Sequence, residues 1–268
     1  MNNIPTSFRS AIMHKYPNAK NLRFPPISGS KHNVIFADIN NKIRVFKFGN
    51  PDIINKNAKI SKIYLDAGIP VPKITVGQFQ NIFFEEYEQL PGTTLFEAVK
   101  NGITANKIRQ IYREILDNFA KMCEIASQTL DNTPFQHIHC VTKSDVTNVN
   151  NATLGKICMA LVYIMNSGTN ADNAVFHSDI TPKNTVVSPD GHLVGFVDTD
   201  SVAVSNINYA FGAMATKYQQ LGFEITELFD YFEKISNKKI NRTRIKTMAN
   251  ANNFGKKVLW HHSQTKQK

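Results

Sequence analysis

Two aspartates and an asparagine in one short stretch have the types and spacing of a metal and acid–base site. Asp179 and Asn184 lie in a polar segment, and Asp198 comes after two further runs of β-branched and aromatic residues. Two carboxylates held about 4 Å apart repel by about 4 kcal/mol at an effective dielectric near 20, so the group needs a cation or a shared proton. A hard divalent cation such as Mg²⁺ suits Asp and Asn oxygens and completes its shell with phosphate and water. Asp179 would then be free to face a hydroxyl nucleophile.

A β-hairpin is expected to bring these side chains together. Residues 185–187 and 193–197 are rich in β-branched and aromatic types, and residues 188–191 between them (SPDG) have turn chemistry. Antiparallel pairing would place Asn184 at the entrance of the hairpin beside Asp198 at its exit. The alternative is an ordinary hairpin whose polar residues only cap the backbone.

A family resemblance rests on residues 177–184 (HSDITPKN) and 197–200 (VDTD). These segments resemble the catalytic and metal-binding loops of the protein-kinase-like superfamily. They look most like its aminoglycoside phosphotransferase, choline kinase and lipopolysaccharide-sugar kinase branch. The resemblance implies that Asp179 is the catalytic base that orients an acceptor hydroxyl. It also implies that Asn184 and Asp198 hold Mg²⁺ against the phosphates of ATP.

The same resemblance implies an α+β, bilobal kinase-like fold. Residues 1–90 would form a small β-rich lobe that binds the nucleotide. Residues 91–268 would form a larger, mainly helical lobe that carries the catalytic residues and binds the acceptor. A chain of 268 residues is long enough for one large domain or two lobes.

Three more polar residues of these loops are candidates for supporting roles. We expect His177 to brace the loop by hydrogen bonding rather than to perform acid–base work. Lys183 stands where the family often has glycine, and it would contact phosphate or point to water. Asp200 would contact a second metal ion or the acceptor, or it would be solvent-exposed.

The expected nucleotide-binding residues lie in the N-terminal part of the chain. Gly29, Ser30 and Asn33 belong to a small polar loop before a predicted hairpin within residues 27–48, and its backbone N–H groups could cover phosphates. A single glycine is weak evidence, and an ordinary turn explains it nearly as well. By its place in the family pattern, Lys47 would neutralise the α- and β-phosphates; otherwise it is a solvated strand lysine.

The sequence departs from the family pattern in the helix expected at about residues 55–67. That helix should carry a glutamate that pairs with Lys47, but the only acids between Lys47 and Gly68 are Asp52 and Asp66, neither well placed mid-helix. Either other groups hold the lysine, or the helix assignment is wrong, or activity is weakened.

Residues 85–95 (EEYEQLPGTTL) resemble the hinge of the same family, where an extended segment presents backbone groups to adenine. We therefore assign Glu86 and Tyr87 to the nucleotide site. Strands are expected at residues 73–79 and 82–87, and the proline and glycine at 91 and 92 should end the second.

The remaining segments predict scaffold rather than chemistry. Apolar residues at helical spacing within 104–130 indicate a core helix. A polar loop is expected at 129–151, and helices at 152–166, 209–221 and 224–234. Three scattered cysteines, Cys123, Cys140 and Cys158, form no CxxC pair, which favours free thiols in a reducing cytoplasm over zinc.

The net charge of +10 is confined to the last 35 residues. Ten of the 31 lysines and arginines fall within 234–268, where there is no acid, so 21 bases and 21 acids precede this basic tail. The tail is either a solvated helix face or a surface that gathers anions, such as a membrane or nucleic acid. No run of eighteen apolar residues predicts a transmembrane helix.

These features together predict an ATP- and Mg²⁺-dependent phosphotransferase that acts on a hydroxyl of a small molecule or saccharide. A lipopolysaccharide-type sugar would suit the basic tail, with the protein in the cytoplasm, at the inner face of a membrane. The alternatives are a protein kinase and a catalytically weak, nucleotide-binding scaffold. A nucleic-acid-binding module is disfavoured, because residues 1–233 are charge-balanced.

Overall fold

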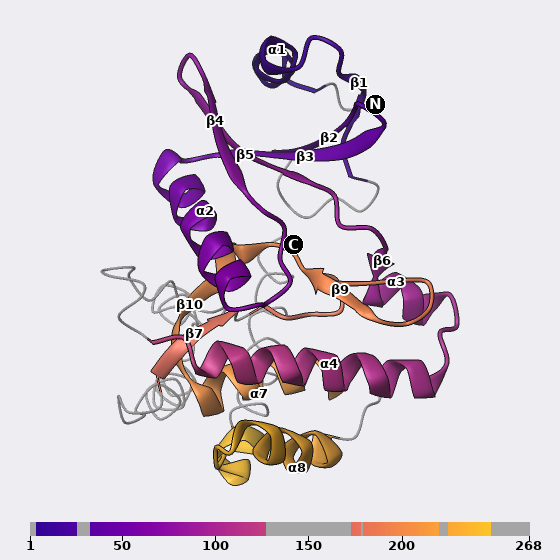
Figure 1. Ribbon diagram of the computed structural model, residues 1–268, viewed down its shortest axis with the longest axis vertical. Helices are drawn as coiled ribbons and strands as arrows, with labels where there is room; N and C mark the ends of the chain where they lie inside the picture. The colour runs from indigo at the N-terminus through magenta and orange to yellow at the C-terminus, as the bar shows by residue number, and fades with distance from the viewer. Residues whose placement is uncertain (1–3, 26–32, 127–172, 178, 220–224, 248–268) are drawn as a thin grey trace, which may run out of the picture.

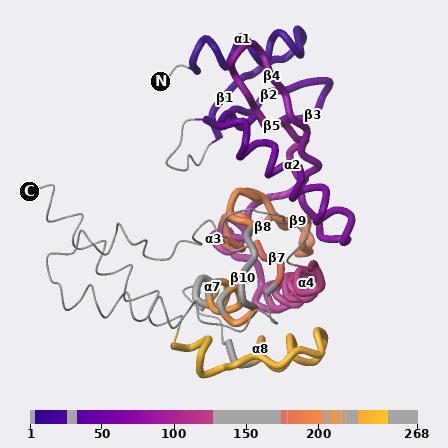
Figure 2. The backbone as a smooth tube through the Cα atoms, turned by 90° about the vertical axis from the view of Figure 1, so that its left-hand side faces the viewer, coloured from indigo at the N-terminus to yellow at the C-terminus, as the bar shows by residue number. Residues whose placement is uncertain are grey.

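A small sheet lobe stacks on a helical lobe in the computed structural model, which describes residues 4–25, 33–126, 173–177, 179–219 and 225–247 (Figure 1). In the second view the sheet lobe again lies above α4 (Ala105–Cys123), α7 (Ile207–Gln219) and α8 (Ile225–Ser236) (Figure 2). The predicted α+β, bilobal architecture is therefore confirmed. None of the helices in these ranges is long and apolar enough to cross a bilayer.

The sheet lobe is a five-stranded antiparallel sheet in the order β1-β2-β3-β5-β4. Its strands are β1 (Lys20–Arg23), β2 (Val34–Ile39), β3 (Lys42–Gly49), β4 (Thr75–Phe79) and β5 (Ile82–Glu88). The β2–β3 turn is formed by Asn40 and Asn41 with φ of 52° and 62°, the left-handed conformation that two-residue hairpin turns require. The predicted strand pairs are thus present.

One face of this sheet is covered by α1 (Thr6–Lys15). Ile12 of α1 packs in one cluster with the sheet residues Phe46, Phe48 and Phe84. Phe8 stacks on Phe48 at a centroid distance of 4.0 Å. Side chains alternate between the two faces of a strand, so Lys47, which lies between Phe46 and Phe48 in β3, points to the opposite face of the sheet.

The opposite face carries α2 (Pro51–Asp66), which begins four residues earlier than expected. The side chain of Asn50 accepts a hydrogen bond from the Asp52 N–H at 2.8 Å, and Pro51 occupies the first turn, where its missing N–H costs nothing. Gly68 ends the helix with φ of 67°. This cap sets the register of the helix and so places its middle residue, Asn57.

The helical lobe is built on α4, whose predicted apolar stripe is buried. Thr104 caps its start, and Phe119 makes ring contacts with Phe176, Phe211 and Phe232 from the elements around it. The buried residues of the stripe are Ile108, Ile111, Ile115, Phe119, Met122 and Ile125. The helices expected at 209–221 and 224–234 are present as α7 and α8 with shifted bounds. The expectations for residues 129–151 and 152–166, and for Cys140 and Cys158, fall outside the described residues.

The hairpin expected at 185–197 is present and joins the two lobes. Its strands β8 (Thr185–Val187) and β9 (Leu193–Phe196) pair antiparallel, with Thr185 opposite Phe196. Strand β8 also pairs with the short strand β6 (Thr93–Thr94), which the helix α3 (Leu95–Lys100) follows in the chain. Phe196 N–H bonds to Pro70 O at 2.9 Å, which ties β9 to the segment after α2.

A second pairing, which the sequence analysis did not foresee, fixes the start of the polar loop. Strands β7 (Asn173–His177) and β10 (Val202–Asn206) are antiparallel, with His177 opposite Val202. The short 3-10 turn η3 (Thr199–Ser201) leads into β10. Both ends of the segment that carries the predicted chemistry are therefore held by strands.

Candidate active site

Asp179 and Asn184 are held together by the loop between β7 and β8. The Asn184 side chain donates from Nδ2 to Asp179 Oδ2 at 2.8 Å and to the Asp179 carbonyl oxygen at 3.1 Å. The backbone turns tightly, because Thr181 N–H bonds to Asp179 O and Asn184 N–H bonds to Thr181 O. The amide oxygen of Asn184 is the atom left to face a metal ion, since its nitrogen faces Asp179.

The buried side chain of His177 holds this loop in place through two polar contacts. It is only 2% exposed, and its Nε2 lies 3.0 Å from the Val197 carbonyl oxygen while its Nδ1 lies 3.3 Å from the Asp179 N–H. Burial lowers the pKa of the imidazole, so the neutral ring donates at Nε2 and accepts at Nδ1. The expected bracing contacts are present, and the ring links the Asp179 loop to the strand that precedes Asp198.

Asp198 follows directly on the hairpin and lies beside Asn184. Val197 N–H bonds to the Asn184 carbonyl oxygen at 2.9 Å, so the two ends of the hairpin meet as predicted. Asp198 has φ of 66° and ψ of 57°, a left-handed conformation that is uncommon outside glycine and that often marks a functional position. This backbone turn aims its carboxylate at the sheet lobe.

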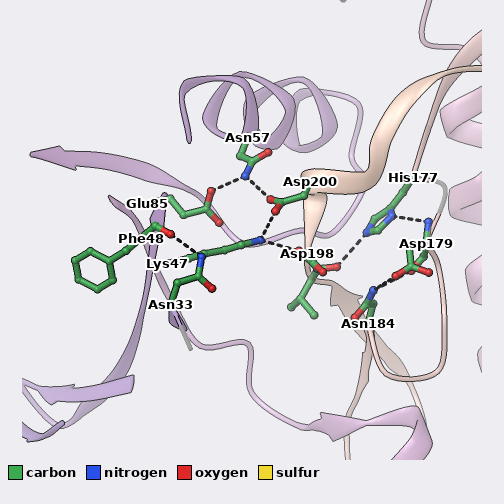
Figure 3. Close-up of polar contacts among 11 residues, drawn as sticks. Asn33, Lys47, Phe48, Asn57, Glu85, His177, Asp179, Asn184, Asp198 and Asp200 are labelled. Carbon is green, nitrogen blue, oxygen red and sulfur yellow. Dashed lines mark hydrogen bonds and ion pairs between the residues drawn. The ribbon is translucent and has the colours of Figure 1, made fainter. Parts of the chain in front are cut away.

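Lys47 crosses from β3 to meet that carboxylate. Its Nζ lies 2.7 Å from Asp198 Oδ1 and 2.6 Å from Asp200 Oδ2, and its side chain is 17% exposed (Figure 3). The repulsion anticipated between the carboxylates is thus relieved here by pairing: Asp198 pairs with the lysine, and Asp179 with an amide. Asp200 also contacts Lys47 in this structure, and its predicted contact with a second metal ion or the acceptor stays a prediction.

Two further residues complete the surroundings of Lys47. Asn57, in the middle of α2, donates from Nδ2 to Glu85 Oε2 at 2.7 Å and to Asp200 Oδ1 at 2.5 Å. Glu85 on β5 is the cross-strand partner of Lys47, so both side chains lie on one face of the sheet. The helix is therefore correctly assigned, and groups other than a helix glutamate surround the lysine.

The buried position of these charges changes their pKa values. Burial alone would lower the pKa of Lys47, but Asp198, Asp200 and Glu85 together raise it well above its usual value, so the lysine stays charged. Burial raises the pKa of Glu85 to about 7, although Lys47 and the hydrogen bond from Asn57 both act to lower it. The cluster holds one cation among three carboxylates.

The donors at the hairpin ends suit Mg²⁺. Asn184 and Asp198 offer an amide oxygen and carboxylate oxygens, and Mg²⁺ normally takes one or two protein ligands and completes its octahedron with phosphate and water. Among the described residues, no group of three or more His, Cys, Asp or Glu side chains is placed to hold a metal ion.

Comparison with known proteins gives a match at the level of structure alone. No protein-family model and no curated protein sequence matches this chain. Spectinomycin phosphotransferase, solved with ADP and spectinomycin, matches with a TM-score of 0.69 and 14% identity over 97% of this chain and 87% of that chain. An aminoglycoside phosphotransferase from Streptomyces rimosus, solved with ADP and streptomycin, matches with a TM-score of 0.65 and 13% identity over 92% and 97%. This chain has the aminoglycoside phosphotransferase fold.

A third match comes from the GDP complex of aminoglycoside 2'-phosphotransferase-IIIa, with a TM-score of 0.66 and 12% identity over 98% of this chain and 100% of that chain. The match therefore extends over nearly the full length of both chains. The resemblance of the loops around Asp179 and Asp198 to the protein-kinase-like superfamily is therefore accompanied by the fold of its aminoglycoside phosphotransferase members.

Within this fold, the two hinge residues assigned to the nucleotide face opposite sides of the sheet. Glu86 is 3% exposed, and its Oε1 accepts from Lys15 Nζ at 2.6 Å and from the Tyr16 hydroxyl at 3.1 Å, beneath α1. Only its backbone could meet a nucleotide. Tyr87 lies opposite Val45 on the Lys47 face, and burial raises its pKa. Both assignments to the nucleotide stay predictions.

Two other predicted residues, Asn33 and Lys183, lie at the edges of the site. Asn33 donates from Nδ2 to the Phe48 carbonyl oxygen at 2.6 Å, so its side chain fastens the start of β2 to the end of β3. Gly29 and Ser30 fall outside the described residues. Lys183 is exposed, with its Nζ 5.3 Å from the centroid of the Phe96 ring at the start of α3.

The sequence analysis missed Asn57 and Glu85. Glu85 was detectable in principle, because the predicted strands place it opposite Lys47 once their register is known. The local pattern of apolar and polar residues does not determine the register between β3 and β5. Asn57 gave no signal of its own, since an asparagine in mid-helix indicates only weak helix propensity.

Proposed function

We propose that this protein is a phosphotransferase that moves the γ-phosphoryl group of ATP to a hydroxyl group. The acceptor oxygen forms a bond to the γ-phosphorus while the bond to the β–γ bridging oxygen breaks. ADP leaves, and the hydroxyl proton passes to Asp179. The observation that carries this proposal is the pairing at the hairpin: Asp179 with Asn184 on one side, and Asp198 with Lys47 on the other.

Each of these residues has a role that its contacts allow. Asp179, oriented by Asn184 and by the loop that His177 braces, accepts the proton and aligns the oxygen. Lys47 is positively charged and can move from Asp198 to the nucleotide phosphates. Asn184 and Asp198 would hold Mg²⁺, which would neutralise charge on the phosphates during transfer.

We propose a small molecule or saccharide as the acceptor. Among the matched structures, the acceptors named are streptomycin and spectinomycin. In this chain the exposed Lys183 stands in the same loop as Asp179 and lies over Phe96, which favours an acceptor that combines a ring with negative charge. A lipopolysaccharide-type sugar has that character.

The described bases of the basic tail pair with acids of the helical lobe. In its described part, Arg242 pairs with Asp230 at 2.6 Å and with Glu233 at 2.7 Å, and Lys238 lies 3.3 Å from Glu124. These bases are partly neutralised within the helical lobe. Any attraction to an anionic membrane, with the protein at its inner face in the cytoplasm, would depend on the remaining bases.

The test is transfer by the purified protein. With ATP, Mg²⁺ and a panel of hydroxyl acceptors, mass spectrometry should detect phosphate on at least one acceptor. Asp179→Asn should lower transfer by about a hundred- to ten-thousandfold, the usual contribution of a general base, and leave nucleotide affinity within about twofold. Asp190→Asn, in the exposed hairpin turn, is the matched control and should transfer normally. Transfer that survives in Asp179→Asn would refute the assignment.

One observation favours a second function, a nucleotide-binding scaffold without transfer. Asn57 occupies the middle of α2, where the family resemblance leads us to expect a glutamate. A scaffold would bind nucleotide with Mg²⁺ and phosphorylate no acceptor in the panel. The same assay therefore separates the two functions.

A further inference from the structure

A ring of four neighbouring polar residues, joined by three contacts, links α2 to Lys47 without a helix carboxylate. Lys47 contacts Asp200 at 2.6 Å, Asp200 accepts from Asn57 at 2.5 Å, and Asn57 donates to Glu85 at 2.7 Å. Glu85 is the fourth member, because it lies directly across the β3–β5 pair from Lys47 and its charge acts on the lysine, although the two side chains make no hydrogen bond or ion pair (Figure 3). The four residues come from α2, β3, β5 and η3, so the ring joins elements of both lobes.

The chemistry of the ring explains why its helix member is an amide. Asn57 is 1% exposed and has two N–H hydrogens, one for each carboxylate. An acid at this position would add a third negative charge beside Glu85 and Asp200, at a buried place where like charges are costly. The Asn57 Oδ1 atom is buried without a hydrogen-bond partner, so both described polar contacts of this side chain are made by its nitrogen.

We propose that Asn57 is a positioning residue for Lys47, acting through Asp200 and Glu85 in place of a helix carboxylate. The proposal rests on the phosphotransferase function given above. Asn57 does not touch the nucleotide in this scheme. It gathers two carboxylates from other elements and fixes them around the lysine, so that a displacement of α2 would move the lysine as well.

The ring would also hold Lys47 if Asp198 were engaged by Mg²⁺. Lys47 then loses one of its two close carboxylates, and a buried ammonium group without a counter-charge is strongly unfavourable. Asp200 stays with it at 2.6 Å, and Asn57 keeps Asp200 and Glu85 in place. Lys47 therefore remains oriented while its other hydrogen atoms face the phosphates.

The test uses isosteric exchanges of amide and carboxylate in the full-length protein. Asn57→Asp replaces the donor with a third carboxylate. Asn57→Asp/Glu85→Gln exchanges the amide and the carboxylate between positions 57 and 85, so one N–H···O contact and the total charge are restored while Asp200 stays with Lys47. Asn118→Asp is the matched control, because Asn118 is a buried helix asparagine of α4 whose amide bonds within its own helix.

Affinity for ADP with Mg²⁺, measured by calorimetry, should fall about tenfold or more in Asn57→Asp, because a displaced Lys47 would lose a charge-assisted contact to the phosphates. The exchanged pair should recover most of this loss. Asn118→Asp should bind as the wild type does. Unchanged affinity in Asn57→Asp, or no recovery in the exchanged pair, would overturn the proposal.

A second readout needs no nucleotide. Asp200→Asn keeps shape at a partly exposed side chain, and it removes one carboxylate from Lys47. The acetylation rate of Lys47 at pH 9, followed by peptide mass spectrometry, should rise about tenfold for each unit by which its pKa falls. Asn57→Ala should raise it as well, and an unchanged rate in both would overturn the proposal. If the wild type binds no nucleotide but these rates change, the ring stands and the phosphotransferase function fails.

Discussion

Replacing Glu85 with glutamine should stabilise the folded protein at neutral pH. Glu85 is 3% exposed, and its pKa is raised from 4.5 to about 7, chiefly by burial. A shift of roughly 2.5 pKa units corresponds to about 3 kcal/mol, at 1.36 kcal/mol per unit, which the folded state loses when this carboxyl group ionises. Glutamine keeps the shape and an oxygen that accepts from Asn57, but it never ionises.

The sign of the effect follows from which state binds the proton. Below pH 4.5 the carboxyl group is protonated in both states, so the wild type and Glu85→Gln should have similar stabilities. Between pH 4.5 and 7 the unfolded chain releases the proton while the folded protein keeps it, so wild-type stability falls. Above pH 7 the difference should level off at about 3 kcal/mol, or roughly 6–12 °C in Tm for a chain of this size.

The measurement is Tm of both proteins from pH 4.5 to 8, expressed as a difference so that unrelated titrations cancel. The charged groups that face Glu85 are Lys47 on β3 and Asp198 and Asp200 after β9. Glu88→Gln is the control on the same strand; its exposed ion pair with Lys42 should contribute at most about 1 kcal/mol. A difference curve for Glu85→Gln that stays flat across this range would refute the reasoning.

Three further substitutions, one of them a control, test how the scaffold holds the site. Gly92→Ala should lower the free energy of unfolding by about 2 kcal/mol or more, because Gly92 has φ of 149° and an added Cβ would lie 2.3 Å from Val187 O. Gly102→Ala, at φ of 81° with open space, should cost only about 1 kcal/mol in the same urea titration. His177→Ala should cost about 2–4 kcal/mol, since it leaves a cavity and removes the contacts to Val197 and Asp179. A cost below about 1 kcal/mol would show that His177 does not brace the loop.

The elements that local chemistry dictates could be predicted from the sequence. The β8–β9 hairpin was expected from its β-branched runs and its turn, and Gly191 indeed has φ of 89° there. The buried stripe of α4 was expected from helical spacing alone. Since the hairpin was correct, the approach of Asn184 and Asp198 followed from it, and the Val197 to Asn184 backbone bond bears it out.

Contacts between distant segments could not be predicted in this way. The β7–β10 pair joins residues 173–177 to 202–206, and nothing in the short run of β10 identifies its partner. The start of α2 was placed too late, because its first turn depends on the cap at Asn50 and on Pro51 rather than on apolar spacing. Boundaries set by a single cap are weakly marked in a hydrophobic pattern.

The charge balance around Lys47 bears on how a departure from a family pattern is interpreted. A buried lysine requires counter-charge, but electrostatics does not specify which element must supply it. In this chain Asp198, Asp200 and Glu85 supply it, and none of them belongs to α2. With three carboxylates already present, a helix carboxylate would overload the cluster, whereas the two N–H groups of Asn57 lower the repulsion between Glu85 and Asp200. The absence of a helix glutamate is therefore what this arrangement of charges requires, and it is not by itself a sign of lost activity.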